Sequence, residues 1–422
     1  SFTEDEAAAE AAVVNTSTFI DSAKQESIDE ILSVAQLKKT GKLKYLIVTG
    51  CLAQRYQDEI LKLIPEVDAV LGTTAEDSIG EVLRKLSEGE KPEKAVIENP
   101  DLVPSAARQV LTFGSFVGYL KIAEGCNKCC TYCAIPSIRG HYRSVPMDQI
   151  LEDARGLAAQ GAKELILVAQ ETTLYGVDLY GKKMLPELLR RLCLVNGIRW
   201  IRVLYCYPEE ITDELIDVLA EGGKIVPYLD MPIQHASDRI LKKMGRRTNR
   251  KELEETVRKL RERVPGICLR TTLITGFPGE TEEDHRELLD FVRNMQFDRL
   301  GVYTYSREEG TPAAKFDQQV HPSTKKRRQK ELMLTQQEIA FRNEEAQTGR
   351  ELDVLIEGRL ADELTGNGYV YVGRTYMDAP DVDSNIFVET TRDLMSGTFV
   401  RVRVTGSQDY DLTGEIIDES AE

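Results

Sequence analysis

Three cysteines in one short segment carry the clearest chemistry of this 422-residue chain. Cys126, Cys130 and Cys133 stand in the run GCNKCCTYCAIP, with the spacing Cys-x3-Cys-x2-Cys. This spacing brings three thiolates into a single loop, close enough to hold three corners of an iron–sulfur cluster. A structural metal site needs a fourth ligand. Three cysteines therefore favour a cluster that leaves one iron open for another molecule.

A zinc site is the alternative interpretation of the same run. Its fourth ligand would be Cys129 or His141. Zinc knuckles usually pair two Cys-x2-Cys arms across a longer loop, and no second arm stands nearby. Cys129 is adjacent to Cys130, and neighbouring thiolates rarely both reach one cluster. We therefore expect an iron–sulfur cluster in which Cys129 takes no part.

Length and composition indicate a globular protein of about three domains. Apolar residues make up 41% of the chain and charged residues 29%, and no apolar stretch approaches the ~20 residues of a membrane span. Eight cysteines in loops and single strand positions are not typical of a secreted disulfide framework, so we expect a cytoplasmic protein. Because the chain opens at Ser1 rather than Met, we expect the first domain to be truncated at its start.

Charge is distributed unevenly along the chain, whose net charge is −16. Residues 351–422 hold sixteen acidic residues, five arginines and no lysine, a balance of −11. Such a surface repels a phosphate backbone and attracts a basic protein. The basic run KKRRQK, residues 325–330, has two interpretations: a nucleic-acid patch or, more often for such runs, a solvated helix face.

Hydrophobic patterns predict an α/β chain with an all-β end. Short apolar runs around residues 12–16, 44–50 and 68–73 alternate with helical patterns, which predicts a parallel sheet. Ser17 and Cys51 follow two of these strands and should face the same crevice. The final seventy residues hold short β-rich segments separated by Gly, Asn and Asp, which is typical of a small barrel or sandwich.

Six longer strand–helix units fill the middle of the chain. They predict a partial barrel, two units short of closure, with active groups at the carboxyl ends of its strands. The three clustered cysteines follow the first of these strands, in agreement with that placement. The expected strands are residues 119–123, 164–170, 200–206, 228–233, 268–276 and 299–306.

Longer motifs resemble the methylthiotransferases of the radical S-adenosylmethionine (SAM) superfamily, over essentially the whole chain. The matching segments are YLKIAEGC, CAIPSIRG, ELILVAQETTLYGVDLY, YLDMPIQHASDRILKKMGR, RTTLITGFPGETEED and VGRTYMDAPDVDSNIFV. The resemblance implies a flavodoxin-like domain over residues 1–110, a partial (β/α)6 radical SAM barrel of TIM type over 111–350 and a TRAM β-barrel over 351–422. DAPDVD and YGVDLY point to the branch that modifies an aspartate of ribosomal protein S-twelve.

The resemblance also implies a reaction and its cofactors. SAM binds the open iron of a 4Fe–4S cluster held by the three clustered cysteines, with Tyr132 near its adenine, and yields a 5′-deoxyadenosyl radical. A second 4Fe–4S cluster in the first domain donates sulfur, so that a methylthio group is attached to the β-carbon of the aspartate. Three cysteines hold this second cluster in the family. Here Cys51 matches one, Ser17 replaces another and no cysteine precedes it.

Further polar residues stand at the expected active face. Gln170 and Thr172 follow the second barrel strand, where they could hold the ribose or carboxylate of SAM. Gln234 and His235 end the fourth strand in the same way. His235 is a candidate catalytic residue, although a single histidine is more often structural. Arg270 lies inside an apolar strand, so it should face a carboxylate of SAM or substrate, or form a structural ion pair.

Two rival functions differ in their partners. The sister branch modifies adenosine in tRNA, which a basic last domain would favour, so the acidic domain makes tRNA an unlikely partner. A non-catalytic iron–sulfur module for ribosome assembly is the other rival, and it would not cleave SAM. We expect instead that the acidic domain docks the basic S-twelve protein. We also expect a separate electron donor such as flavodoxin and no membrane partner.

Overall fold

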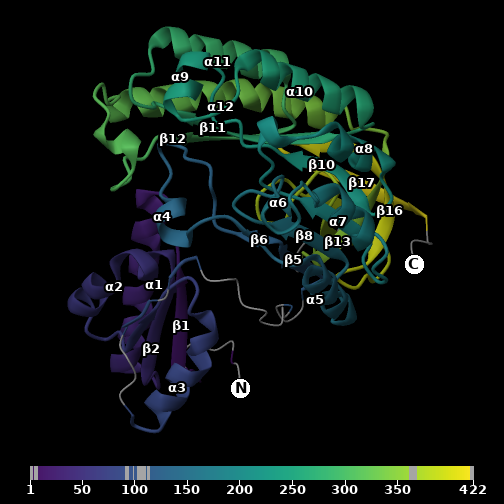
Figure 1. Ribbon diagram of the computed structural model, residues 1–422. Helices are drawn as coiled ribbons and strands as arrows, with labels where there is room; N and C mark the ends of the chain where they lie inside the picture. Colours follow the sequence, from purple (N-terminus) through teal and green to yellow (C-terminus); the bar gives the residue numbers. More distant parts are fainter. Residues whose placement is uncertain are drawn as a thin grey trace. The chain divides into compact units, whose positions relative to one another are not determined.

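A computed structural model describes most of the chain, namely residues 3, 8–90, 95–97, 99–101, 111, 115–360 and 368–418. The chain divides into two compact units, which Figure 1 colours by sequence. The first unit comprises residues 1–108, 123–145 and 306–316, and the second comprises residues 109–122, 146–305 and 317–422. The domain boundary expected near residue 110 lies outside the described residues.

The first unit is built on a parallel sheet of four short strands in the order β1-β2-β3-β4. The three strands predicted from the apolar runs are confirmed as β1, β2 and β3. The two-residue strand β4 was not predicted from the sequence. The elements are β1 (Ala11–Thr16), α1 (Asp21–Thr40), β2 (Tyr45–Gly50), α2 (Cys51–Leu63), β3 (Ala69–Leu71), the 3₁₀ turn Glu76–Ser78, α3 (Ile79–Ser87), β4 (Ala95–Val96), β6 (Ala123–Glu124), α4 (Ile135–Arg139), β7 (Arg143–Ser144) and the 3₁₀ turn Pro312–Lys315.

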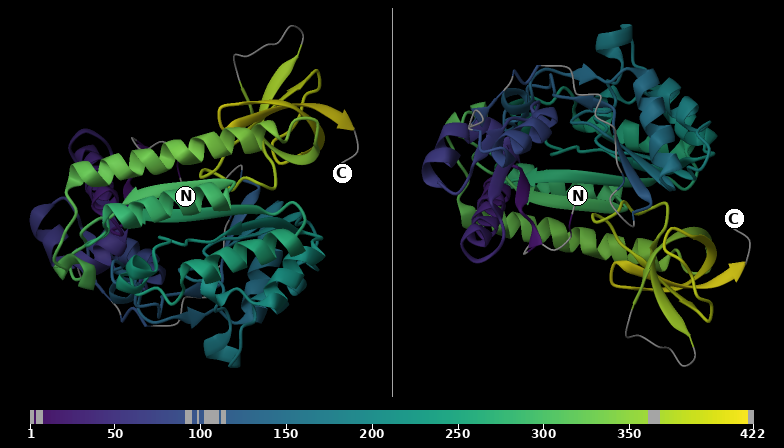
Figure 2. Two further views of the ribbon diagram at one scale, coloured as in Figure 1. Left: turned by 90° about the horizontal axis from the view of Figure 1, so that it is seen from above. Right: turned by 90° about the horizontal axis from the view of Figure 1, so that it is seen from below.

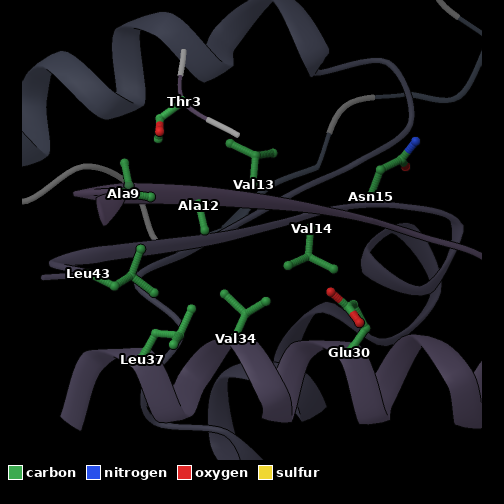
Figure 3. A pocket seen from close by; sticks show the side chains of 11 residues that line it. Thr3, Ala9, Ala12, Val13, Val14, Asn15, Glu30, Val34, Leu37 and Leu43 are labelled. Carbon is green, nitrogen blue, oxygen red and sulfur yellow. The ribbon is translucent and has the colours of Figure 1, made fainter. Parts of the chain in front are cut away.

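A cavity of about 390 Å³ runs beside strand β1, an edge of this sheet (Figure 3). Its lining is mostly aliphatic, and Val13 on the strand is 41% exposed. An edge strand with apolar side chains presents an unpaired backbone and apolar surface together. The lining residues are Thr3, Ala9, Ala11, Ala12, Val13, Val14, Asn15, Glu30, Val34, Leu37 and Leu43.

The second unit contains the six-stranded sheet expected from the sequence, in the order β12-β11-β10-β9-β8-β5. Every neighbouring pair is parallel, and β5 and β12 form the two edges, so this is an incompletely closed barrel. All six predicted strands are confirmed, with small differences at their ends. They are β5 (Val117–Lys121), β8 (Glu164–Val168), β9 (Trp200–Val203), β10 (Ile225–Asp230), β11 (Cys268–Thr275) and β12 (Arg299–Thr304).

Helices alternate with these strands, and local sequence signals start several of them. The Thr281 hydroxyl accepts the backbone N–H of Asp284, whose carboxylate accepts that of Thr281, a reciprocal cap. None of the described helices is long and apolar enough to cross a membrane. They are α5 (Met147–Ala159), α6 (Val177–Tyr180), α7 (Leu185–Leu192), the 3₁₀ turn Pro208–Glu210, α8 (Asp213–Glu221), α9 (Asp238–Lys243), α10 (Arg250–Arg263), α11 (Glu282–Met295) and α12 (Pro322–Glu345).

The chain ends in a closed five-stranded barrel, which confirms the expected all-β domain. The long helix α12 runs along β12 and reaches this barrel (Figure 2). The apolar core of the small barrel is continuous with apolar side chains of the six-stranded sheet. Trp200 of β9, for example, packs edge-on against Phe399 of the barrel, with ring centroids 4.7 Å apart. The barrel strands are β13 (Glu351–Arg359), β14 (Tyr369–Arg374), β15 (Ile386–Thr390), β16 (Phe399–Gln408) and β17 (Asp411–Asp418).

Buried ion pairs tie the small barrel to the six-stranded sheet. The Glu164 carboxylate of β8 lies 2.8 Å from Nε of Arg202 and 2.7 Å from Nη2 of Arg374 in β14. All three side chains are almost completely buried. Because removing one partner leaves a buried charge uncompensated, such a network strongly favours one arrangement of the barrel on the sheet.

The acidic run DAPDVD, residues 378–383, takes part in the same junction. Asp378 is 2.6 Å from Nη2 of Arg299, which also contacts Glu344 of α12. Asp383 accepts a hydrogen bond from Tyr228 at 2.7 Å. Two of the three aspartates in this run are therefore bound within the protein.

Glu344 should make stability depend on pH. Burial raises its pKa from 4.5 to about 7, opposed by Arg299 and reinforced by Asp378. The fold thus favours the protonated carboxyl, so its contribution is complete below 4.5 and is lost as the pH rises through about 7. Thermal unfolding of Glu344→Gln should lose this dependence.

Glu345→Gln is the matched control, because Glu345 is the exposed neighbour on the same helix. It should keep the melting profile of the parent chain across this pH range. Identical profiles for the parent and Glu344→Gln would contradict the assignment.

Candidate active site

Short backbone contacts close the cysteine loop at both ends. Strands β6 and β7 pair through Ala123 with Ser144 and Glu124 with Arg143. Inside this ladder the Cys126 N–H donates to the carbonyl of Gly140 at 3.2 Å. These backbone hydrogen bonds therefore hold the cysteine loop in the form of a hairpin.

Gly125 is required by the geometry of this hairpin. Its φ is +78°, a conformation that glycine adopts without steric cost. A Cβ at this position would lie only 2.1 Å from the carbonyl oxygen of His141. The backbone before Cys126 can approach the returning strand this closely only because residue 125 has no side chain.

The three predicted ligands are brought together. Cys126 and Cys130 are buried and Cys133 is half-buried. The pKa of Cys133 is raised to about 12, chiefly by burial, while the Ile135 N–H opposes the rise and the neighbouring Cys130 and Cys126 sulfurs add smaller increases. Backbone N–H groups of Lys128 and Ile135 lie 3.4 and 3.5 Å from the Cys126 and Cys133 sulfurs.

This donor set fits a four-iron cluster better than a single ion. Among the residues that the structure describes, no three His, Cys, Asp or Glu side chains are arranged to hold one metal ion. A 4Fe–4S cluster instead takes each cysteine on a different iron. Cys129 is exposed, and Nδ1 of His141 lies 3.0 Å from Asp101. Neither proposed fourth zinc ligand joins the buried sulfurs.

Tyr132 and Cys51 also lie in the first unit. Tyr132 is half-buried and stands between Cys130 and Cys133 in the sequence. Cys51 begins α2 and packs against Ala134 and Ile138. Ser17 and Cys51 directly follow Thr16 and Gly50, which are paired across β1 and β2. The strand ends are therefore adjacent, as expected.

Arg139 is a site residue that sequence patterns did not reveal. It lies 3.0 Å from the buried Glu124, and it also interacts with the thiol of Cys51. Burial nevertheless raises the pKa of Cys51, which Arg139 partly counteracts. Arg139 thus links the residue before the cysteine loop to the start of α2. In the sequence, only the position of Arg139 shortly after Cys133 could have indicated that it belongs to this site.

The remaining candidates lie in the second unit. Gln170 is half-buried beyond the end of β8. Thr172 is fully buried, and its hydroxyl donates to the carbonyl of Leu204 at 2.7 Å. Thr172 therefore joins the ends of two neighbouring strands through this contact.

Gln234 has an unusual backbone. Its φ is +78°, although it is not glycine. Its N–H donates to Thr272 and its carbonyl accepts from Ile274, so the segment after β10 is bridged to β11. The side-chain Oε1 is buried without a hydrogen-bond partner among the described residues. Strained residues of this kind concentrate at functional sites.

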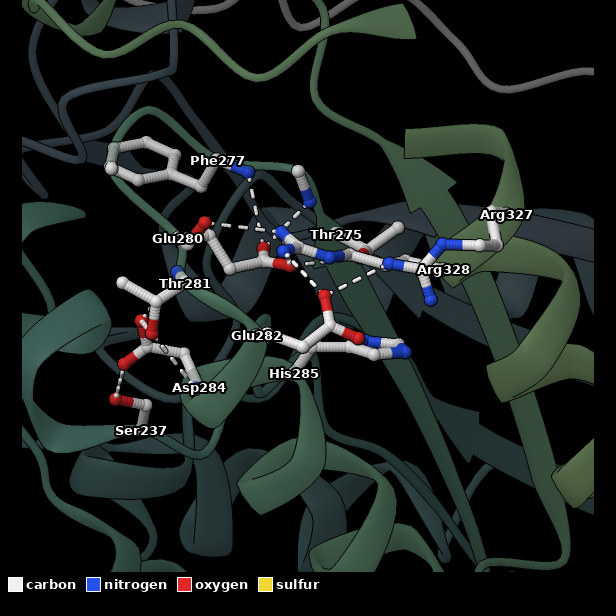
Figure 4. Close-up of polar contacts among 12 residues, drawn as sticks. Ser237, Thr275, Phe277, Glu280, Thr281, Glu282, Asp284, His285, Arg327 and Arg328 are labelled. Carbon is white, nitrogen blue, oxygen red and sulfur yellow. Dashed lines mark hydrogen bonds and ion pairs between the residues drawn. The ribbon is translucent and has the colours of Figure 1, made fainter. Parts of the chain in front are cut away.

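A buried polar network surrounds Glu280 of the GFPGE turn (Figure 4). His235 lies against this network. Its Nδ1 accepts the Ser237 N–H at 3.0 Å, and its Nε2 lies 3.6 Å from Glu280. Glu280 also accepts the Gly276 N–H at 2.6 Å and pairs with Arg328 at 2.9 Å. Both ring nitrogens of His235 therefore lie next to groups of the chain itself.

The basic run 325–330 is partly used by the same network. Arg328 is buried and pairs with Glu280 and Glu282 (Figure 4). Arg327 is half-exposed and pairs with Glu282 and with Glu331. Neither interpretation of the run describes Arg328, which is neither part of a nucleic-acid patch nor solvated.

Arg270 faces two carboxylates of the chain itself. Its Nη1 lies 2.9 Å from Asp230 in β10, and its Nε lies 3.3 Å from Asp383 of the small barrel. Burial lowers the pKa of the guanidinium, but these carboxylates outweigh it and raise the pKa overall. The ion pairs satisfy the requirement of a buried arginine for a partner.

Comparisons with known proteins agree with this architecture. Family models match the radical SAM superfamily over residues 120–292, the TRAM domain over 348–417 and the uncharacterized protein family UPF0004 over 1–72. The solved radical S-adenosylmethionine methyltransferase TsrM from Kitasatospora setae is 19% identical, with a TM-score of 0.53. The match covers 72% of this chain and 65% of that one, and it shows a shared fold.

Two curated relatives match nearly the whole chain, and both are named ribosomal protein uS12 methylthiotransferase RimO. The protein from Lachnoclostridium phytofermentans is 59% identical over 98% of this chain and 92% of its own length. The protein from Clostridium botulinum strain Eklund 17B is 48% identical over 98% and 91%.

The fold and the cysteine loop together define a radical SAM enzyme that carries a TRAM barrel. Its cofactors are a 4Fe–4S cluster and SAM, as predicted. Within that class, the chain belongs to the ribosomal protein uS12 methylthiotransferase family. The predicted family and fold are confirmed.

Replacing Gly125 should prevent cluster binding. In Gly125→Ala the new methyl group would collide with the His141 carbonyl and open the hairpin around Cys126. After anaerobic reconstitution the variant should lose most of the about four iron atoms per chain of a single cluster.

Gly156→Ala is the control, because a Cβ at this position in α5 meets nothing within 4 Å. It should bind iron like the parent chain. Circular dichroism would show that both variants remain folded, and full iron content in Gly125→Ala would refute the steric argument.

Proposed function

We propose that this enzyme attaches a methylthio group to the β-carbon of an aspartate in ribosomal protein uS12. The observation that carries the proposal is the near-complete match to two uS12 methylthiotransferases, combined with a loop that gathers three cysteines for a radical SAM cluster. The acidic last domain supports a basic protein substrate over tRNA. A protein substrate of this kind also favours the cytoplasm.

Within the cysteine loop, the chain's own groups would prepare the cofactor site. Cys126, Cys130 and Cys133 would hold the cluster, which when bound supplies the electron for reductive cleavage of SAM. The N–H groups of Lys128 and Ile135 would stabilise negative charge on two of the sulfurs. Tyr132 is proposed to contact the adenine of SAM.

The residues at the ends of β1 and β2 do not fit a second four-iron cluster. Among the described residues there, Cys51 offers a thiol and Ser17 only a hydroxyl, which is a poor iron ligand. The Cys51 thiol is also buried, with a raised pKa. We therefore assign no reaction step to this position.

For polar groups of the second unit we propose two kinds of role. Gln170, Thr172 and Gln234 are proposed to orient SAM at the carboxyl ends of β8 and β10. For His235 we propose a positioning role, since it lies against Glu280 in the turn after β11. Arg270 is proposed to act through Asp383, coupling the sheet to the small barrel.

Partners and boundaries complete the proposal. The small barrel would dock uS12, and a separate reductant such as flavodoxin would supply electrons. We propose domain boundaries near residues 110 and 350; the family matches leave residues 73–119 and 293–347 uncovered.

Loss of one cluster cysteine should abolish SAM cleavage. Cys126→Ala, Cys130→Ala and Cys133→Ala should each form no 5′-deoxyadenosine after anaerobic reconstitution and reduction with dithionite, because three thiolates are needed to hold the cluster. Cys129→Ala should retain cleavage, since Cys129 is exposed. Cleavage in all three buried-cysteine variants would refute the cluster assignment. No cleavage by the parent chain would favour a non-catalytic module.

Binding distinguishes the two methylthiotransferase branches. The reconstituted chain should bind purified uS12 more tightly than tRNA at matched physiological salt, because residues 351–422 carry a balance of −11. The affinities can be compared by fluorescence anisotropy. Preference for tRNA would transfer the chain to the adenosine-modifying branch.

A further inference from the structure

Residues 306–316 form a segment that connects distant parts of the first unit. The segment follows β12 in the chain, yet it belongs to the same compact unit as α1, α2 and the cysteine loop. Thr311 and Ala313 within it are almost completely buried. We call these residues the bridging segment, because its first and its later residues contact different elements of the unit.

The bridging segment contacts the cysteine loop through the backbone. The Ala313 N–H donates to the carbonyl of Thr131 at 2.8 Å. Thr131 stands between Cys130 and Cys133 in the sequence, and the Cys133 N–H donates to the Cys130 carbonyl at 3.1 Å. The peptide between the second and third expected cluster ligands is therefore held from outside the loop as well as from within it.

Glu308 attaches the other end of the bridging segment to two helices. Its side chain is only 1% exposed, and its Oε2 lies 3.7 Å from Nη1 of Arg55 in α2 and 3.9 Å from Nζ of Lys24 in α1. These distances are too long for hydrogen bonds, so the attraction depends on charge. The Ser306 hydroxyl donates to Oε1 of the same carboxylate at 2.6 Å. A carboxylate this deeply buried requires its cations.

Further hydrogen bonds link this attachment to the contact with the cysteine loop. Arg55 also donates to the carbonyl of Glu309. The Thr311 hydroxyl donates to the carbonyl of Glu308 at 2.7 Å, which fixes the chain two residues before Ala313. A continuous series of contacts therefore runs from α2 through the bridging segment to the cysteine loop.

We propose that Glu308 is a positioning residue for the radical SAM cluster. By fixing the bridging segment on α1 and α2, it holds the Thr131 carbonyl and with it the peptide between two ligands. Ligands that the surrounding structure holds in place need no rearrangement when the cluster binds, and they release it slowly. This inference rests on the cluster ligands given in the proposed function and does not depend on which substrate is modified.

Hydrogen exchange of the chain without cofactor tests the bridge directly. In Glu308→Gln the side chain keeps its shape but loses the charge that attracts Lys24 and Arg55. Peptides from the bridging segment and from residues 126–134 should then exchange about fivefold faster than in the parent chain, because both ends of the bridge open more often. Mass spectrometry of these peptides gives the rates.

The cluster supplies two further measurements. In reconstituted Glu308→Gln, an excess of a ferrous-iron chelator under anaerobic conditions should remove iron about fivefold faster than from the parent chain. The midpoint potential, followed by electron paramagnetic resonance, should also become more positive. A looser loop admits water, which stabilises the additional negative charge of the reduced cluster. A general loss of stability would lower the amount of bound cluster without shifting the potential of the remainder.

Glu309→Gln is the matched control. Glu309 is the next residue in the chain and is exposed, so the substitution changes the net charge equally. Its side chain accepts a hydrogen bond from Tyr56 at 3.4 Å, which glutamine can also accept. Exchange, iron release and potential should all stay close to those of the parent chain.

Arg55→Gln tests the same attachment from its partner and provides a second variant if Glu308→Gln does not fold. It should also accelerate iron release. In the double variant the acceleration should be smaller than the product of the two single effects, because both substitutions remove one shared contact. Independent, multiplying effects would contradict the attachment.

The outcomes separate this inference from the proposed function. Unchanged exchange in Glu308→Gln would overturn the bridge, and faster exchange with unchanged iron release and potential would overturn the positioning role. Equal effects of Glu309→Gln would show that only net charge matters and would also overturn it. A parent chain that bound no iron would refute the cluster ligands and this inference together. No measurement here uses uS12, so the substrate assignment can fail without affecting the result.

Discussion

The buried carboxylate of Glu164 is the interaction on which the second unit depends. It lies between guanidinium groups from the sheet and from the small barrel, Arg202 and Arg374, and none of the three has appreciable contact with water. A buried ion is tolerated only when its partners are correctly placed. The junction therefore selects one arrangement of barrel and sheet far more strictly than apolar packing alone, which tolerates small displacements.

The cysteine loop shows a different strategy, based on the backbone. Its sulfurs are positioned by a two-residue ladder, by a few N–H donors and by one glycine that lets two chain segments approach closely. Arg139 extends this frame to α2 through Glu124 and Cys51. Pre-organisation of this kind means that ligand positions do not depend on flexible side chains of the surrounding domain.

Local patterns in the sequence predicted most of the fold but few of its polar contacts. Apolar runs located the six barrel strands because buried parallel strands are continuously hydrophobic. The cysteine spacing located the cluster loop because its ligands are close in sequence. Glu280 and Arg328, by contrast, are 48 residues apart, and only the packing of α12 brings them together. The basic run likewise gave no indication that Arg328 is buried, since a count of charges does not show in which direction each side chain points.

The use of Asp378 and Asp383 as internal partners has a consequence for evolution. These residues belong to the last domain, yet the groups that they neutralise, Arg299 and Arg270, belong to strands of the preceding one. A recombination event that replaced the last domain without this loop would leave each of these two guanidinium groups with one of its two carboxylate partners missing. The two domains are therefore expected to be inherited together. New substrate preferences would then arise more readily by point changes at exposed positions than by exchange of the whole module.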